Sequence, residues 1–167
     1  HQIGCELISP ASPLGDAEII ACGVHILKSL GVLDQTVLHL NTLGDSDSRQ
    51  AYRAALIAYL QAYRNDLSED SQRRLDTNPL RILDSKSASD RDILQDAPQL
   101  HRYLTPAAQT HFDAVKEALQ AASITWVDDP FLVRGLDYYS HTAFEFITDQ
   151  LGAQGTVLGG GRYDGLS

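Results

Sequence analysis

Methionine is absent from this chain of 167 residues, and cysteine occurs only twice, as Cys5 and Cys22. Two cysteines are too few for a framework of disulfide bonds, so we expect a protein of a reducing compartment, the cytoplasm. No apolar run approaches the roughly 18 residues that a membrane-spanning helix needs, and no apolar leader follows charged residues at the start. These absences predict a protein that does not associate with membranes.

Basic residues are also scarce: 13 lysines and arginines stand against 22 acidic residues, which gives a formal charge of −9. An acidic balance disfavours nonspecific binding to nucleic acid. The charge is uneven, however, because residues 49–91 contain eight basic and six acidic residues and therefore carry +2. This segment is interpreted first as a solvated helical surface, and alternatively as a local face that contacts phosphates.

Enough apolar residues are present for a packed core, at 43% of the chain. The chain begins directly in a strand-like run, HQIGCELIS, and ends inside a glycine-rich stretch, GGGRYDGLS. Both ends have the character of the middle of a fold. We therefore expect this sequence to be a piece of a longer protein.

The first 45 residues alternate between strand and helix patterns. Residues 1–9 alternate apolar and polar side chains, which predicts a half-buried strand. Helix signals run from Asp16 to Gly31, where glycine ends the pattern. Residues 36–42 predict a second strand.

From residue 45 to residue 123 the pattern is almost purely helical. Ser68 and Thr105 are each placed to cap the start of a helix, and apolar residues recur every three or four positions from Ala108 to Ala122. Strand patterns return at 124–127, 142–148 and 154–158. The sequence therefore predicts an α+β fold, with an antiparallel sheet and flanking helices interrupted by an α-helical insertion. The expected segments are 1–45, 46–123 and 124–167.

The segment FLVRGLDYY at 131–139 combines a guanidinium, a carboxylate and two phenols. These groups belong to Arg134, Asp137, Tyr138 and Tyr139, and they lie between two predicted strands. One interpretation is a structural ion pair between Arg134 and Asp137 with the tyrosines in the core. The alternative is a ligand site. The residue types alone favour neither interpretation over the other.

A second unusual segment is GTVLGGGRYDG at 155–165. It is not a phosphate-binding P-loop, because no Gly-Lys-Ser/Thr follows, and Asp164 occupies the position of the third glycine of a dinucleotide motif. A bulge or turn explains three successive glycines equally well. Arg162, Tyr163 and Asp164 directly after them favour a ligand pocket.

The histidines and cysteines do not have the spacing of a metal site. Cys22 and His25 lie three residues apart on a predicted helix, and two ligands do not make a zinc site. His39 alternates with leucines and is expected at a strand surface, and no ligand spacing relates His101, His111 and His141. We predict no metal held by protein ligands.

Three segments together resemble the histidyl-tRNA synthetase family of class II aminoacyl-tRNA synthetases. LVRGLDYY at 132–139 and GTVLGGGRYDGL at 155–166 are similar to the two histidine-specific signatures, and HQIGCE at 1–6 is similar to the strand that closes motif 2. The resemblance implies a catalytic core made of 1–45 and 124–167 with the insertion 46–123 between them. It also implies that histidine and ATP, accompanied by Mg²⁺, form histidyl-adenylate, and that histidine then passes to the 3′ end of tRNA.

The resemblance assigns roles to individual residues. Arg134 matches the active-site arginine, whose fixed charge suits a phosphate oxygen and the substrate carboxylate. Gln2 and Glu6 match positions that bind the substrate ammonium, and neutral imidazole offers one donor and one acceptor to nearby phenols. The expected imidazole-reading residues are Tyr138, Tyr139 and Tyr163, and the expected close backbone walls are Gly4, Gly159, Gly160 and Gly161. The insertion is expected to approach the acceptor arm of tRNA.

Some elements of the family are not among these residues. Motif 1, which makes the family's homodimer, the motif 2 arginine, motif 3 and the anticodon-binding domain are missing, so we expect the isolated chain to be inactive. Two alternatives stay open: the regulatory subunit of ATP phosphoribosyltransferase, which generally lacks the insertion, and a histidine-binding scaffold module without chemistry.

Overall fold

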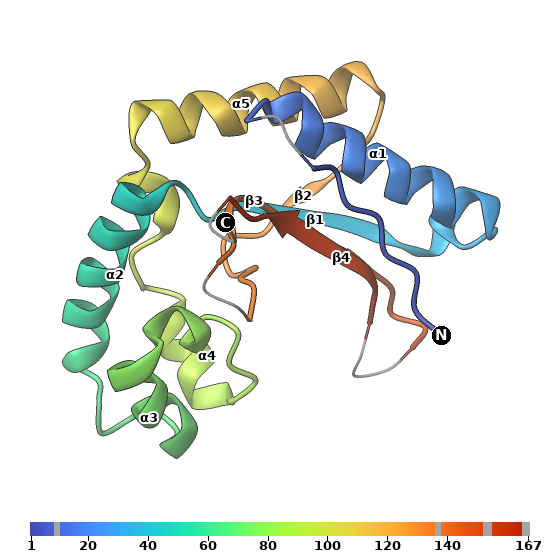
Figure 1. Ribbon diagram of the computed structural model, residues 1–167. Coiled ribbons are helices and arrows are strands. Elements are labelled where there is room, and N and C mark those ends of the chain that lie inside the picture. Colours follow the sequence, from blue (N-terminus) through green and yellow to red (C-terminus); the bar gives the residue numbers. More distant parts are fainter. Residues whose placement is uncertain (9–10, 136–137, 152–154, 165–167) are drawn as a thin grey trace.

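The computed structural model describes residues 1–8, 11–135, 138–151 and 155–164. Its centre is a four-stranded sheet with the order β2-β1-β3-β4 (Figure 1). The β1–β3 and β3–β4 pairs are antiparallel, whereas the short β2 runs parallel to β1. The fold is therefore α+β with a mixed sheet, antiparallel except at one edge. The strands are β1 (Val37–Thr42), β2 (Val127–Asp128), β3 (Ser140–Ile147) and β4 (Thr156–Arg162).

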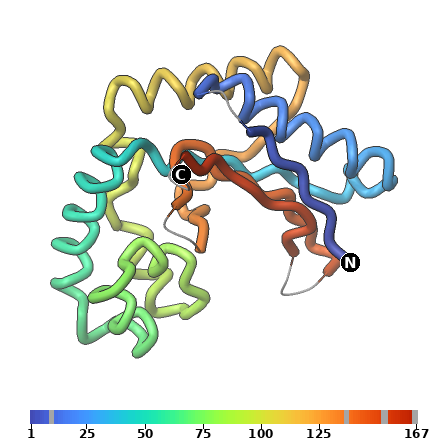
Figure 2. Tube along the Cα trace, in the orientation of Figure 1, coloured from blue at the N-terminus to red at the C-terminus, as the bar shows by residue number. Residues whose placement is uncertain are grey.

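Two long helices, α1 (Pro13–Ser29) and α5 (Pro106–Ala121), lie side by side and cover one face of the sheet (Figures 1 and 2). The predicted cap at Thr105 is confirmed, since its hydroxyl accepts a hydrogen bond from the Ala108 amide. Both helices and β1 and β3 share one core that includes Ile20, Leu40 and Phe144. We call this half of the molecule the sheet unit, which comprises residues 11–45, 105–135, 138–151 and 155–164.

Residues 46–104 make a helical unit with a second core of its own (Figure 1). Its main helices are α2 (Ser46–Gln61), α3 (Glu69–Thr77) and α4 (Ala88–Leu94). Ser68 accepts from the Ser71 amide, so the predicted cap of α3 is confirmed. Short 3₁₀ turns complete the chain at Leu33–Gln35 in the sheet unit and at Pro79–Ile82 and Leu100–Tyr103 in the helical unit.

The helical segment predicted over 46–123 is divided between the two cores. Helix α5 packs on α1 and the sheet, with Val115 and Leu119 fully buried in the core of the sheet unit. Its apolar stripe packs against β1 and β3. The helix belongs to the connection between the parallel strands β1 and β2, and such a connection crosses one face of the sheet. The self-contained helical core ends at Leu104.

The prediction of a half-buried strand over residues 1–9 is wrong for residues 1–8, which have no strand structure and are exposed. Ile3 and Ile8 are more than four-fifths exposed. Alternation alone does not make a strand, because a strand also needs a partner for its backbone hydrogen bonds. The segment runs past the sheet unit instead, and Leu7 approaches Gly15 at the start of α1 (Figure 2).

In the part of the chain that the structure describes, no helix combines the length and apolar character that crossing a bilayer requires.

Candidate active site

Three tyrosines from two distant segments meet where β3 begins and β4 ends. The ring centroids of Tyr138 and Tyr139 are 4.8 Å apart, and Tyr163 meets them edge-on at 5.7 and 6.0 Å. The register explains this meeting: Ser140 pairs with Arg162, so the residues just before one and just after the other become neighbours. The predicted imidazole-reading residues therefore lie together.

Glu6 lies beside this tyrosine cluster although its segment is not a strand. Burial raises the pKa of the Tyr163 phenol, and the carboxylate of Glu6 raises it further. Burial and hydrogen bonding with Tyr139 raise the pKa of Tyr138, with a smaller contribution from Glu6. All three tyrosines and one acidic group are thus close enough to contact a single small ligand.

Arg134 stands over the same cluster, with its guanidinium carbon 5.2 Å from the centroid of the Tyr139 ring. Its Nη1 donates to Glu145 Oε1 at 2.8 Å, and Glu145 also accepts from the Thr156 hydroxyl. Within the described residues, Nε of Arg134 is buried without a hydrogen-bond partner. An arginine held on one side and unsatisfied on the other is suited to an anionic ligand.

Glu145 was not singled out by the sequence, because its place on the outer face of an alternating strand is typical of any solvated residue. The alternative pairing of Arg134 with Asp137 lies outside the described residues. What the structure places against Arg134 is Glu145, with both side chains about one-fifth exposed.

Successive glycines of β4 bring the backbone close to these side chains. A Cβ at position 159 would lie 3.1 Å from Nη1 of Arg134, and one at position 161 would lie 3.0 Å from the Tyr139 ring. At position 160 a Cβ would meet the Phe144 ring at 2.7 Å, on the core side of the sheet. Gly161 therefore borders the tyrosine cluster, Gly159 borders Arg134, and Gly160 borders the core.

Gln2 and Gly4 are not placed against the other candidates. Both are exposed, and a Cβ on Gly4 would have no described atom within 4 Å. Their roles as an ammonium ligand and a backbone wall stay predictions.

A cavity of about 320 Å³ opens between the sheet unit and the helical unit, next to Arg134 and Tyr139. Arg49 on α2 borders it and donates to the backbone oxygen of Tyr139 at 2.6 Å, which ties the helical unit to the tyrosine cluster. Arginine and asparagine side chains line the cavity together with apolar ones. Its lining includes Asn41, Arg49, Arg53, Asn78, Leu80, Leu83, Val133, Arg134 and Tyr139.

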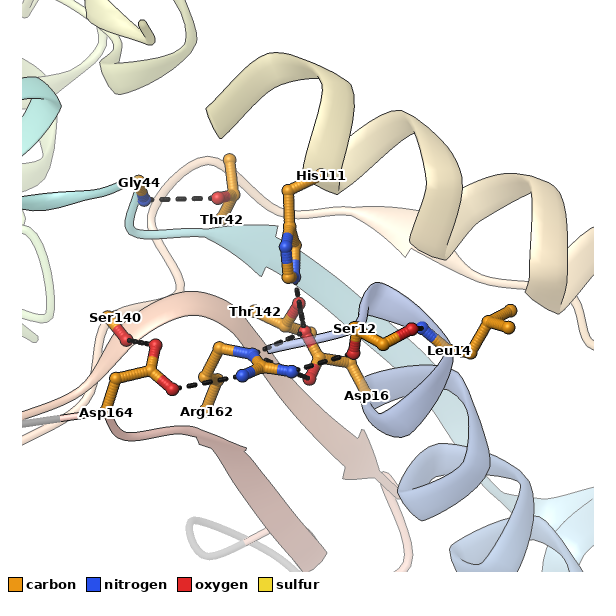
Figure 3. Close-up of polar contacts among 10 residues, drawn as sticks. All are labelled: Ser12, Leu14, Asp16, Thr42, Gly44, His111, Ser140, Thr142, Arg162 and Asp164. Atoms are coloured by element: carbon orange, nitrogen blue, oxygen red, sulfur yellow. Dashed lines mark hydrogen bonds and ion pairs between the residues drawn. The ribbon is translucent and has the colours of Figure 1, made fainter. Parts of the chain in front are cut away.

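Asp16, His111, Thr142 and Arg162 form a largely buried polar group whose contacts the sequence did not predict (Figure 3). Asp16 and Arg162 form an ion pair of 2.8 Å, and their side chains are only 7% and 10% exposed. His111 and Thr142 also bond to Asp16. The only local signal was an acidic residue in the first turn of a helix, which is typical of many exposed positions.

No group of three or more His, Cys, Asp or Glu residues that could hold a metal ion occurs among the described residues. His111 and His141 stack on one another, with ring centroids 4.4 Å apart, and His39 bonds to Asp129.

Comparison with known proteins shows which family this chain resembles in sequence. A family model described as histidyl-tRNA synthetase matches residues 1–167. The histidine–tRNA ligase of Gluconacetobacter diazotrophicus is 57% identical over 166 residues, which are 99% of this chain and 40% of that protein. The histidine–tRNA ligase of Streptococcus pyogenes serotype M1 is 54% identical over 99% of this chain and 39% of its own length.

Solved structures agree with the sequence comparisons. The crystal structure of apo S. aureus histidyl-tRNA synthetase superposes with a TM-score of 0.70 at 36% identity, over 93% of this chain and 37% of that chain. An ATP phosphoribosyltransferase regulatory subunit/histidyl-tRNA synthetase from Bacillus halodurans has a TM-score of 0.53 at 22% identity over 95% of this chain and 45% of that chain, which shows a shared fold alone. The chain spans about 40% of the length of the curated relatives it matches. It belongs to the histidyl-tRNA synthetase family.

Proposed function

We propose that this chain is the central part of the catalytic core of a cytoplasmic, homodimeric histidine–tRNA ligase. In the complete protein it activates histidine with ATP to histidyl-adenylate and passes the histidine to the 3′ end of tRNA. One observation carries this proposal: Glu6 and Tyr163, from the two ends of the chain, lie against the segment that carries Arg134, Tyr138 and Tyr139.

Arg134 is the residue to which we assign the chemistry. Attack of the histidine carboxylate on the α-phosphorus increases the negative charge on the phosphate oxygens, which a fixed cation stabilises. The pair with Glu145 orients the guanidinium. Its buried Nε has no hydrogen-bond partner among the described residues, so a turn of the side chain would let Nε donate to a phosphate or carboxylate oxygen.

The tyrosines and Glu6 select the amino acid. Each phenol can donate to or accept from a neutral imidazole, and the carboxylate of Glu6, assisted by Gln2, balances the substrate ammonium. An amino acid with an apolar side chain leaves these polar groups unpaired, so it is rejected strongly.

ATP contacts this site through its phosphates, because the guanidinium of Arg134 suits an anionic group. Mg²⁺, when bound, neutralises part of the charge of the ATP phosphates. We assign it no protein ligand.

The helical unit is proposed to approach the acceptor arm of tRNA. Its arginines on α2 reach the cavity beside Arg134, and residues 49–91 carry the positive part of an acidic chain. We place the boundary of the insertion at residue 104 rather than 123, because α5 packs with the sheet. The helical unit and the intact arginine signature favour the synthetase over the regulatory subunit.

Replacement of Arg134 in the complete protein tests the proposal. Arg134→Lys keeps the charge but loses the planar fork, so histidine-dependent exchange of pyrophosphate into ATP should fall about 100-fold or more. Arg64→Lys is the matched control, because Arg64 pairs with Asp76 on the exposed surface of the helical unit. Retention of exchange within a few-fold in the Arg134 variant would contradict the assignment.

A further inference from the structure

We propose that Asp16 and Arg162 act as a positioning pair, which holds the tyrosine cluster in the geometry that binds the imidazole. This inference rests on the proposed function, since it concerns the same site. Neither residue belongs to the tyrosine cluster. Their side chains are almost completely buried and pair with each other (Figure 3).

Asp16 accepts hydrogen bonds from residues on three elements other than its own helix. Its Oδ2 accepts from His111 Nε2 on α5 at 2.8 Å and from the Thr142 hydroxyl on β3 at 2.6 Å. Its Oδ1 accepts from Nε and Nη2 of Arg162 on β4, at 2.9 and 2.8 Å. One carboxylate thereby joins α1, α5, β3 and β4.

The carboxylate is ionised in this setting. Burial alone would raise the pKa of Asp16, but the hydrogen bonds from His111, Arg162 and Thr142 outweigh burial and hold the pKa below its ordinary value. An ionised carboxylate only accepts hydrogen bonds, so His111 donates from Nε2. The stacked His141 limits how far the His111 ring can turn.

Arg162 also donates hydrogen bonds to two groups other than Asp16. Its Nη2 donates to the backbone oxygen of Ser12 at 2.9 Å, and its Nη1 donates to Asp164 at 3.0 Å. Asp164 in turn accepts from the hydroxyl of Ser140 at 2.9 Å. Only the planar fork of arginine satisfies these directions at once, and a lysine ammonium would not.

The residues so joined flank the tyrosines in the sequence. Ser140 directly follows Tyr139, and Arg162 and Asp164 stand on either side of Tyr163. Fixing Ser140, Arg162 and Asp164 therefore fixes both segments that carry the phenols. A displacement of about 1 Å at a binding group costs up to about 100-fold in rate, so this support has a functional consequence.

The test compares Asp16→Asn with a variant of equal stability in the complete protein. Asp16→Asn leaves Arg162 buried without its counter-charge, and we expect the KM for histidine to rise about ten-fold while the KM for ATP changes less than about two-fold. Val115→Ala is the control, because Val115 is fully buried on α5 in the apolar core and does not bond to the pair. If both variants lower the unfolding midpoint equally and only Asp16→Asn raises the KM for histidine, the proposal is supported.

Thr142 supplies a milder pair of variants that leave the ion pair intact. Thr142→Ser keeps the hydroxyl that donates to Asp16 and should retain the KM for histidine, whereas Thr142→Val should raise it. Equal KM values for histidine in Asp16→Asn and Val115→Ala would overturn the proposal, as would equal values in the two Thr142 variants.

Hydrogen exchange separates this inference from the proposed function. If the wild-type protein shows no histidine-dependent pyrophosphate exchange, the proposed function fails. Faster amide exchange at residues 138–142 and 160–164 in Asp16→Asn, but not in Val115→Ala, still supports the positioning pair. Unchanged exchange there overturns it.

Discussion

Each of the two units buries an aspartate, and the two carboxylates are stabilised in different ways. Asp90 in the helical unit is completely buried and accepts from the hydroxyls of Ser68, Ser71 and Ser85 and from the Ser68 amide. Asp16 in the sheet unit is bonded instead to an arginine and a histidine as well as a hydroxyl. Both carboxyl groups have a pKa below their ordinary value, because hydrogen bonds outweigh burial.

The sequence distance to the partners also differs. The serines that surround Asp90 lie 5 to 22 residues away, within the helical unit. The partners of Asp16 lie 95, 126 and 146 residues away and belong to three other elements. A local cluster stabilises one unit, whereas a long-range cluster joins segments that meet at the candidate active site. The comparison predicts local consequences for one aspartate and consequences at the site for the other.

Asp90→Ala is the variant that should break the helical unit most strongly. It leaves the buried hydroxyl of Ser71, the half-buried hydroxyls of Ser68 and Ser85 and the Ser68 amide without an acceptor, which costs about 3 kcal/mol. Amide exchange of α3 should then accelerate by about a hundred-fold, while exchange of β3 stays unchanged.

Asp92→Ala is the matched control on the same helix, because Asp92 is exposed. It should leave exchange of α3 close to that of the wild type. Equal acceleration in α3 and β3 of the Asp90 variant would contradict the independence of the two units.

Two glycine variants sharpen the comparison within the sheet unit. A Cβ at 161 would lie 2.7 Å from the backbone oxygen of Thr142, which cannot move cheaply, so Gly161→Ala should destabilise the protein by about 1–3 kcal/mol. At 159 the nearest atom is the end of the Arg134 side chain, which can shift where a backbone atom cannot, so Gly159→Ala should lower the rate of histidine activation more than the stability.

Denaturant unfolding and pyrophosphate exchange, measured on both glycine variants, check this contrast. If Gly159→Ala proves the more destabilising of the two, the close approach of Arg134 to β4 is not as described.

Mild acid should weaken the sheet unit and spare the helical unit. Burial lowers the pKa of His141 below 6.5, and the neighbouring His111 and Arg162 lower it too, against opposing contributions from Asp164 and Asp45. The folded state therefore binds fewer protons than the unfolded state, and stability falls as the pH drops below about 6.5. The carboxylate of Asp90 stays ionised until far lower pH, because its pKa lies below 3.8.

Amide exchange of β3, α2 and α3 at pH 7.5 and 5.5 measures this difference. The loss of protection in β3 is at most about ten-fold for each unit by which the pKa of His141 differs between the folded and unfolded states. His141→Asn should flatten the pH dependence, since asparagine tolerates the left-handed backbone at this position, where φ is 45°. A pH dependence that persists in this variant would assign the effect to another group.

Local features of the fold could be predicted from the sequence. The stripe predicted from Ala108 to Ala122 is buried as far as Leu119, whereas Ala122 lies exposed just after the end of the helix. Both predicted helix caps form. These features depend on neighbouring residues alone. The placement of α5 on the sheet, the parallel β2 and the absence of a strand at 1–8 depend on partners far along the chain, which periodicity does not encode.

The candidate site divides in the same way. Arg134 and the tyrosines were found because family motifs carry long-range information that a single pattern lacks. Glu145 and Asp16 were not predicted as site residues, because each has the local appearance of an ordinary surface acid. Only the sheet register and the packing of α1 show that they bond to the arginines of the two signature segments.

Pyrophosphate exchange by the complete wild-type protein with each standard amino acid tests the central claim most directly. The account predicts that histidine alone stimulates exchange, with phenylalanine and leucine at least about 10⁴-fold weaker in kcat/KM, because they leave the phenols and Glu6 unpaired. Equal stimulation by another amino acid, or no stimulation by histidine, would contradict it.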